Sequence, residues 1–230
     1  MLPILLIPGL ICTDEVFAPQ LPALWPFGPV TIASTLVGDS MAAIAASILA
    51  IAPPRFALAG VSMGGYLSFE VLRQAPERVV KLALLDTSAR PDTPEQSAGR
   101  RAMVARARNG EYAALVEEIF PALVHPDHIG NDALPAVHRR EAAVIGVDGF
   151  ARQAANITRP DSRPMLATIG VPTIALVGDA DRLTPPDVAK EMADGIAGSR
   201  YVVVPTAGHM SLLEQPQAVN AALVEWMRQA

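Results

Sequence analysis

The sequence predicts an α/β fold in which a mostly parallel sheet is flanked by helices. Short runs of continuous apolar residues alternate with stretches of helical periodicity, and this alternation is typical of a parallel sheet buried on both faces. Near the C-terminus, Val219, Leu223 and Trp226 recur at the spacing of one helix face, which indicates an amphipathic helix. The strands that we expect lie at residues 2–7, 30–33, 56–61, 79–85, 173–177 and 201–204.

Length and composition favour one globular domain spanning residues 1–230. Hydrophobic residues make up 51% of the chain and charged residues 18%, so a sizeable core can form and disorder is excluded. The formal net charge of −5 does not favour a phosphate-binding surface, and we expect no nucleic-acid partner.

The chain has one cysteine, Cys12, which excludes an intrachain disulfide and fits a reducing compartment. Pro8-Gly9 interrupts the apolar start too early for a signal peptide, and no segment approaches about 18 uninterrupted apolar residues. We therefore expect a cytoplasmic protein with no membrane partner, whose oligomeric state the sequence leaves open.

The middle of the chain, from residue 90 to residue 163, interrupts the alternation of strands and helices. It contains no convincing strand but has helical runs at residues 100–108 and 111–120, and Gly146 punctuates it further on. Its ten arginines are matched by ten acidic residues, a balance that indicates solvated helix faces. We expect a helical insertion at residues 90–163 within the single domain.

The motif Gly60-Val61-Ser62-Met63-Gly64 carries the functional prediction. A Gly-x-Ser-x-Gly pentapeptide also occurs by chance, as an ordinary turn with an incidental serine. Here an apolar strand precedes the motif and a helix-forming run over residues 64–73 follows it. A nucleophile elbow needs this context, because its serine sits on a strained strand-to-helix turn whose small neighbours allow close approach. We therefore expect Ser62 to be a nucleophile.

A serine nucleophile needs a base, and His209 is the best placed histidine. The other histidines, His125, His128 and His138, lie in the expected insertion. His209 follows the strand at residues 201–204, and loops at the carboxyl ends of parallel strands face the same rim of the sheet. A surface histidine in that loop is the alternative interpretation.

Two carboxylates compete for the role of orienting the base. Asp179 and Asp181 both follow the strand at residues 173–177, and their distance along the chain does not decide between them. Either one gives the chain order Ser, Asp, His that is found in α/β-hydrolases.

Two backbone N–H groups are candidates for an oxyanion hole. One belongs to Met63, directly after the nucleophile. The other belongs to Leu10 in Pro8-Gly9-Leu10, which follows the first strand, although that tripeptide could also be a simple turn.

Together these motifs resemble the α/β-hydrolase superfamily, in its branch of small esterase-like and C–C-hydrolase-like enzymes. The resemblance covers nearly the whole chain and rests on Pro8-Gly9-Leu10, the elbow at residues 60–65, Gly178-x-x-Asp181-x-x-x-Pro185 and Gly208-His209. In that family the acid is usually the Asp of Gly-x-x-Asp, which favours Asp181 over Asp179. The insertion then corresponds to the cap that roofs the family's pocket and helps to select substrate.

Two features depart from the family pattern. Pro8 stands where the family often has a histidine before the glycine of the oxyanion loop. The family also commonly begins with two antiparallel strands, whereas this chain starts at the oxyanion strand. The resemblance therefore implies a reduced sheet of about six strands.

The predicted function is that of a carboxylesterase acting on a small-molecule ester. Ser62 attacks the carbonyl, His209 takes its proton, Asp181 orients His209, and the N–H groups of Leu10 and Met63 stabilise the oxyanion. The mechanism requires no cofactor, and no metal site is expected because His125 and His128 lack further ligands nearby. Residues that could line an apolar acyl pocket, although most should be core, are Phe17, Trp25, Met103, Tyr112, Ile119, Phe120 and Phe150.

Other functions remain compatible with the same residues. A C–C bond hydrolase or a lyase of the menaquinone-pathway type would use the same triad, and Arg90, Arg106 or Arg152 could then hold a carboxylated substrate. A receptor that has kept the hydrolase fold to bind a small ligand is an alternative from another class.

Overall fold

A parallel sheet of six strands forms the centre of the protein, in the order β2-β1-β3-β4-β5-β6. The structure is a computed structural model that describes residues 1–157 and 159–229. The strands are β1 (Ile4–Ile7), β2 (Val30–Ile32), β3 (Phe56–Val61), β4 (Val79–Leu85), β5 (Thr173–Gly178) and β6 (Arg200–Val204). The prediction of an α/β fold with a reduced, mostly parallel sheet is confirmed, and each expected strand lies within about two residues of its predicted place.

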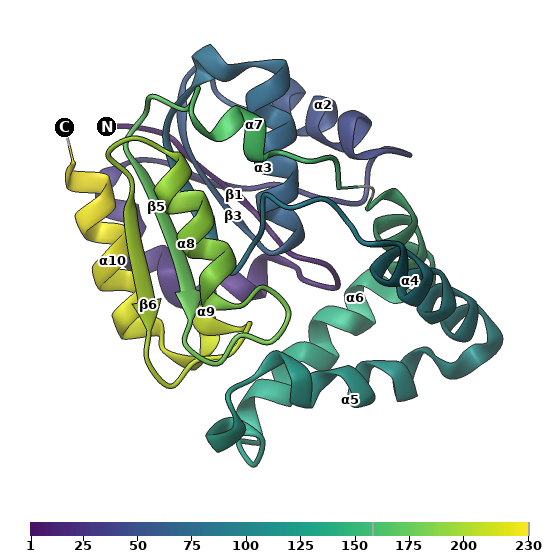
Figure 1. Cartoon of the computed structure of the whole chain (residues 1–230). Coiled ribbons are helices and arrows are strands. Elements are labelled where there is room, and N and C mark those ends of the chain that lie inside the picture. Colours follow the sequence, from purple (N-terminus) through teal and green to yellow (C-terminus); the bar gives the residue numbers. More distant parts are fainter. Residues whose placement is uncertain (158, 230) are drawn as a thin grey trace.

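Helices cover both faces of this sheet (Figure 1). The α-helices of the described chain are α1 (Leu21–Leu24), α2 (Met41–Ile51), α3 (Met63–Gln74), α4 (Pro94–Arg106), α5 (Tyr112–Leu123), α6 (Ala133–Asn156), α7 (Arg163–Leu166), α8 (Pro186–Gly195), α9 (Ser211–Glu214) and α10 (Pro216–Arg228). Side chains of α2, α3 and α8 share one buried cluster with one set of strand residues. Those of α1 and α10 share another with the alternate set. This arrangement explains why the central strands are apolar at successive positions.

Capping side chains mark the residues at which some of the helices begin. The Ser40 side chain accepts the N–H of Ala43 at 3.1 Å and caps α2. Thr93 and Gln96 form a reciprocal capping box at α4, and each such cap contributes about 1 kcal/mol. The amphipathic C-terminal helix is α10, whose Val219, Leu223 and Trp226 are buried.

The segment between β4 and β5 is helical, and we call its residues 94–156, which contain α4, α5 and α6, the cap. Figure 1 shows these helices set to one side of the sheet. Their facing side chains form a separate apolar cluster that includes Leu115, Ala142 and Phe150. Gly146 interrupts the helical conformation, as the sequence suggested: its φ of 65° and ψ of 175° are not helical, and two helical segments of α6 meet there at a kink.

Candidate active site

Ser62 occupies a strained turn between β3 and α3. Its φ of 53° and ψ of −115° cost a non-glycine residue on the order of 1–3 kcal/mol. Hydrogen bonds hold this conformation: the Ser62 N–H donates to the Leu85 carbonyl at 3.0 Å. The Thr87 hydroxyl and the Gly65 N–H donate to the Ser62 carbonyl at 2.7 and 2.9 Å. The turn therefore has the geometry of a nucleophile elbow.

Glycines beside Ser62 allow the backbone segments to approach each other. A Cβ on Gly60 would lie 2.2 Å from the carbonyl oxygen of Gly64, and a Cβ on Gly64 would lie 2.0 Å from the carbonyl oxygen of Ile7. Non-bonded atoms do not approach this closely, so any larger residue would push α3 away from the sheet.

A chain of hydrogen bonds connects Ser62, His209 and Asp181. His209 Nδ1 lies 2.7 Å from Asp181 Oδ2, and His209 Nε2 lies 2.8 Å from Ser62 Oγ. Because an ionised carboxylate only accepts, Nδ1 carries the proton and Nε2 presents its lone pair to the serine hydroxyl. An imidazole in this tautomer can remove the proton of Ser62.

The two carboxylates of the loop after β5, Asp179 and Asp181, have different hydrogen-bond partners. Asp181 Oδ1 accepts the N–H groups of Leu183 and Thr184 at 2.8 and 3.0 Å, and Oδ2 also accepts the Thr184 hydroxyl at 2.8 Å. Asp179 Oδ1 instead accepts the N–H of Ala207 at 3.1 Å. The structure thus places Asp181, and not Asp179, against the imidazole.

Burial and neighbouring charges shift the pKa values of Asp181 and His209 in opposite directions. Burial alone would raise the pKa of Asp181, but the charge of His209 and hydrogen bonds from His209 and Thr184 outweigh it and lower that pKa. Burial would lower the pKa of His209, yet the charge and hydrogen bond of Asp181, with further negative charge from Asp86 and Glu214, raise it. The pair therefore favours the charged form of both groups.

Asp86, at the end of β4, is a fully buried carboxyl group next to this chain. Its Oδ1 accepts the N–H of Gly178 at 3.0 Å, and its Oδ2 lies 2.5 Å from the Ser211 hydroxyl. Burial, followed by the charge of Asp181, raises the pKa of Asp86 to about 8, although His209 and the two hydrogen bonds act against this rise. Through these two hydrogen bonds, Asp86 connects the end of β5, which leads to Asp181, with the segment that follows His209.

Asp86 is a site residue that was not predicted from the sequence. The available signal was a carboxylate directly after a buried parallel strand, at the same edge of the sheet as Ser62.

The two expected oxyanion donors, Leu10 and Met63, belong to the loop after β1 and to the start of α3. Met63 is the first residue of α3, and N–H groups in the first turn of a helix have no partner within the helix. Leu10 lies in the loop after β1 and lines the same cavity as Ser62. The next residue, Ile11, has a φ of 64° and donates its N–H to Gln153 Oε1 of α6 at 3.1 Å.

A cavity of about 410 Å³ opens beside Ser62 and His209. Its walls come from the core and the cap and are almost entirely apolar; they include Val16, Ile119 and Leu212.

The residues that the sequence proposed for an acyl pocket divide into two groups. Met103, Ile119 and Phe150 line the cavity. Phe17 is buried in the core, Trp25 is exposed, and Tyr112 and Phe120 pack within the cap.

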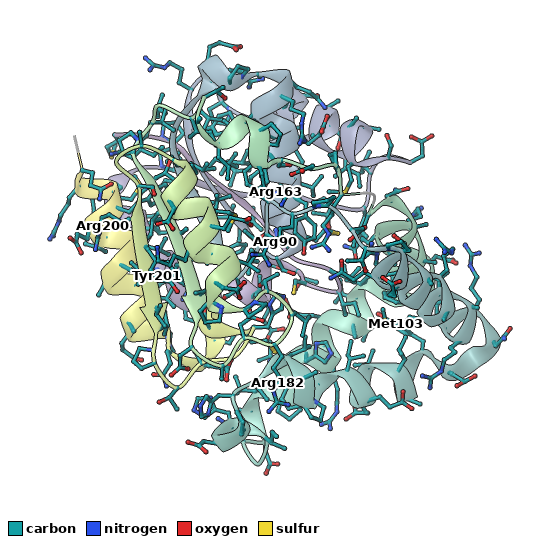
Figure 2. All side chains as sticks on the ribbon, in the orientation of Figure 1. Arg90, Met103, Arg163, Arg182, Arg200 and Tyr201 are labelled. Carbon is teal, nitrogen blue, oxygen red and sulfur yellow. The ribbon has the colours of Figure 1, made fainter. Side chains whose placement is uncertain are left out.

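The arginines considered as substrate-binding groups have other positions. Arg90 forms ion pairs with Asp187 and Glu191 of α8, on the core side of the molecule in Figure 2. Arg106 pairs with Glu111 and Glu118. Neither these two nor Arg152 lines the cavity, whereas Met103, also labelled in Figure 2, projects from α4 of the cap.

Comparison with known proteins places the chain in a family. Residues 4–222 match the alpha/beta hydrolase family. The chain belongs to this family. Over 220 residues it is 29% identical to a pimeloyl-(acyl-carrier protein) methyl ester esterase from Neisseria meningitidis, covering 88% of this chain and 83% of that protein.

Solved structures of similar proteins agree with this membership. A thermophilic esterase from Thermogutta terrifontis matches with a TM-score of 0.88 and 31% identity, covering 99% of this chain and 90% of that one. The enol-lactonase from Burkholderia xenovorans matches with a TM-score of 0.90 and 25% identity, covering 99% and 91% of the two chains.

Within residues 1–157 and 159–229, no group of three or more His, Cys, Asp or Glu side chains could hold a metal ion. In the same part of the chain, no helix combines the length and apolar character needed to cross a bilayer.

Proposed function

We propose that this α/β hydrolase is a serine carboxylesterase that cleaves a small ester through an acyl-enzyme. The observation that carries the proposal is the unbroken hydrogen-bonded chain from Ser62 through His209 to Asp181, which opens on an apolar cavity. Similar proteins support an ester substrate, since they are named as a methyl ester esterase, an esterase and an enol-lactonase.

In the acylation step, Ser62 Oγ attacks the ester carbonyl carbon while His209 Nε2 takes the serine proton. Asp181 holds Nδ1–H, keeps the imidazole in the required tautomer and stabilises its charged form. His209 then donates the proton to the leaving alcohol, and the acyl group stays on Ser62. A water molecule next gives a proton to His209 and attacks the acyl carbon. His209 then returns this proton to Ser62 Oγ as the bond between Oγ and the acyl carbon breaks, which releases the acid and restores the serine hydroxyl.

The negative oxygen of each tetrahedral intermediate is stabilised by the backbone N–H groups of Leu10 and Met63. Donors of this kind contribute most where water is excluded, and each is worth roughly 3 kcal/mol in the transition state. The apolar walls around Ser62 provide such an environment.

The cavity favours a neutral substrate. Among the described residues, no lysine or arginine lines it, and Glu118 contributes the one carboxylate at its wall. A carboxylated acyl group would lose its hydration there without gaining a cationic partner, which costs several kcal/mol. This observation supports an esterase over a C–C hydrolase or lyase that needs a carboxylated substrate.

Replacement of the nucleophile tests the proposal. Ser62→Ala should abolish hydrolysis of p-nitrophenyl esters and covalent labelling by a fluorophosphonate probe, with thermal unfolding close to that of the wild type. Retention of full esterase activity by this variant would refute the assignment of Ser62. A wild-type protein that neither hydrolyses esters nor reacts with the probe, yet binds a small ligand, would instead be a receptor.

A further inference from the structure

We infer that Gln153 and Glu141, two buried side chains of cap helix α6, are positioning residues that hold the oxyanion loop. By oxyanion loop we mean residues 9–16, which follow β1 and include Leu10. The inference rests on the proposed function, in which the Leu10 N–H stabilises the oxyanion.

Gln153 supports the most strained part of the oxyanion loop. It is fully buried; its Oε1 accepts the Ile11 N–H at 3.1 Å, and its Nε2 donates to Thr35 Oγ1 at 2.7 Å. Ile11 is β-branched and has a φ of 64°, a conformation that such residues rarely adopt without support from their surroundings. The hydrogen bond thus fixes the peptide directly after Leu10.

Glu141 holds the other half of the loop. Its Oε1 accepts the backbone N–H groups of Thr13 and Val16 at 2.8 and 3.1 Å, and the side chain is fully buried. Its Oε2 is buried with no hydrogen-bond partner among the described residues. Burying a carboxyl group in such surroundings costs free energy, and the hydrogen bonds that it accepts come from the oxyanion loop: two from the backbone and one from the Thr13 hydroxyl at 3.4 Å.

The loop therefore depends on the cap for several of its backbone hydrogen bonds. These contacts join positions that are 125 to 142 residues apart in the sequence. Helix α6 also contributes His138 and Phe150 to the cavity wall. One helix thus contacts both the space for substrate and the loop that stabilises the transition state, so that disturbing it should lower kcat more than it raises KM.

Two substitutions at the same residue distinguish a role in positioning the oxyanion loop from a role in the stability of the fold. Gln153→Met keeps the length of the side chain but removes both hydrogen bonds. We expect it to lower kcat for p-nitrophenyl esters by roughly 10- to 100-fold with KM changed less than about threefold, since losing a whole oxyanion donor costs about 10²–10³-fold. Gln153→Glu keeps an acceptor for the Ile11 N–H and should restore most of kcat.

Glu141 offers the same kind of pair. Glu141→Gln retains the acceptor for Thr13 and Val16 and should keep kcat near the wild-type value. Glu141→Leu removes that acceptor and should lower kcat.

Asn156→Leu is the matched control on the same helix. In the wild type, Asn156 Nδ2 donates to the Gly38 carbonyl at 3.2 Å. The variant therefore removes a contact between the cap and the core that does not involve the oxyanion loop. It should leave kcat within about twofold of the wild type. Thermal unfolding of every variant identifies losses that come from unfolding.

Fluorophosphonate labelling of Ser62 gives a readout that is independent of the substrate, because the phosphoryl oxygen also gains charge during attack. The inference is supported if Gln153→Met lowers the rate of labelling by about the same factor as it lowers kcat. Labelling and kcat at wild-type rates, or an equal loss in Asn156→Leu, would overturn it. If the wild type is labelled but hydrolyses no ester, the proposed function fails while the labelling rates still test Gln153. If the wild type is not labelled, both fail.

Discussion

Among residues 1–157 and 159–229, four residues other than glycine adopt positive φ angles, and all follow strands at one edge of the sheet. They are Ile11 after β1, Ser62 after β3, Asp86 after β4 and Thr206 after β6. Such conformations persist only where surrounding contacts impose them, and they concentrate at functional sites. The carboxyl edge of the sheet is therefore the strained part of the described chain, and each strained residue lies in or beside the proposed catalytic machinery.

The two carboxylates of the loop after β5 should differ in their effect on catalysis. Asp181→Asn should lower kcat by roughly 10³–10⁴-fold, because an amide in place of the carboxylate no longer holds His209 in the reactive tautomer. Asp179→Asn keeps an oxygen that can accept the Ala207 N–H and should retain most of the activity. Steady-state kinetics of the two purified variants distinguishes them, and an equal loss in both would contradict the assignment of Asp181.

Asp86 should make the stability of the protein depend on pH. Its pKa is raised from an ordinary value of 3.8 to about 8 in the folded state, so the folded protein binds more protons than the unfolded chain between these values. The free energy of unfolding therefore falls as the pH rises through this window. Asp86→Asn keeps both hydrogen bonds but cannot ionise.

Denaturant unfolding at about pH 5 and about pH 8.5 measures this difference. We expect the stability of Asp86→Asn relative to the wild type to be greater at the higher pH than at the lower pH, by several kcal/mol, because only the wild-type carboxyl must lose its proton in the folded state. If the free energies of unfolding of the variant and the wild type differ by the same amount at both pH values, Asp86 does not ionise in this range.

At the scale of elements, the elbow depends on how closely α3 approaches the sheet. A Cβ on Gly64 would lie 2.0 Å from the Ile7 carbonyl oxygen, whereas a Cβ on Gly99 of α4 would meet no atom within 4 Å. The same substitution should therefore have opposite effects at these two positions.

Gly64→Ala should destabilise the protein by more than about 2 kcal/mol and remove activity, because α3 must move away from β1 to relieve the overlap. Gly99→Ala should stabilise the protein by roughly 0.5–1 kcal/mol, since alanine favours a helix interior. Thermal or denaturant unfolding compares the two variants. Stability of Gly64→Ala equal to that of the wild type would contradict the packing described for the elbow.

The elements that could be predicted from the sequence are those with local causes. Strands such as β3 and β4 are continuous apolar runs, and the capping residue Ser40 and the turn at Ser62 act on adjacent residues. The start and length of α6 were not predicted, because its pattern is interrupted at Gly146 and its stability comes from packing against other elements of the cap.

The parts of the candidate site that escaped prediction depend on distant partners. Asp86 meets Gly178 and Ser211, and Gln153 meets Ile11, over separations of 92 to 142 residues. A single sequence contains no local signal for such pairs. The choice of Asp181 over Asp179 was likewise open from the residues alone, and only the resemblance favoured it.

At the scale of the whole molecule, the cavity exists because the cap and the carboxyl edge of the sheet enclose it together. Met103, Ile119 and Phe150 come from the cap, whereas Leu10, Val16 and Leu212 come from the core. Neither part alone would exclude water from Ser62. The arginines of the cap are engaged in surface ion pairs or lie away from the cavity, so its apolar character is not offset by a buried cation.

The enclosed apolar wall should make the enzyme selective for neutral esters. We expect kcat/KM for p-nitrophenyl hexanoate to exceed that for the p-nitrophenyl monoester of adipic acid by at least about 100-fold, because burial of the free carboxylate costs several kcal/mol. The methyl ester of the same adipate substrate has no charge and serves as the control for length. It should be hydrolysed at a rate near that of the hexanoate.

A cation placed in the wall should reverse part of this selectivity. Met103→Arg puts a guanidinium on α4, where Met103 lines the cavity, and should raise kcat/KM for the carboxylated ester relative to the hexanoate by about tenfold. Equal rates on charged and neutral esters in the wild type would mean that the acyl group binds outside this cavity. In that case the apolar enclosure would protect the reacting atoms from water without selecting the substrate.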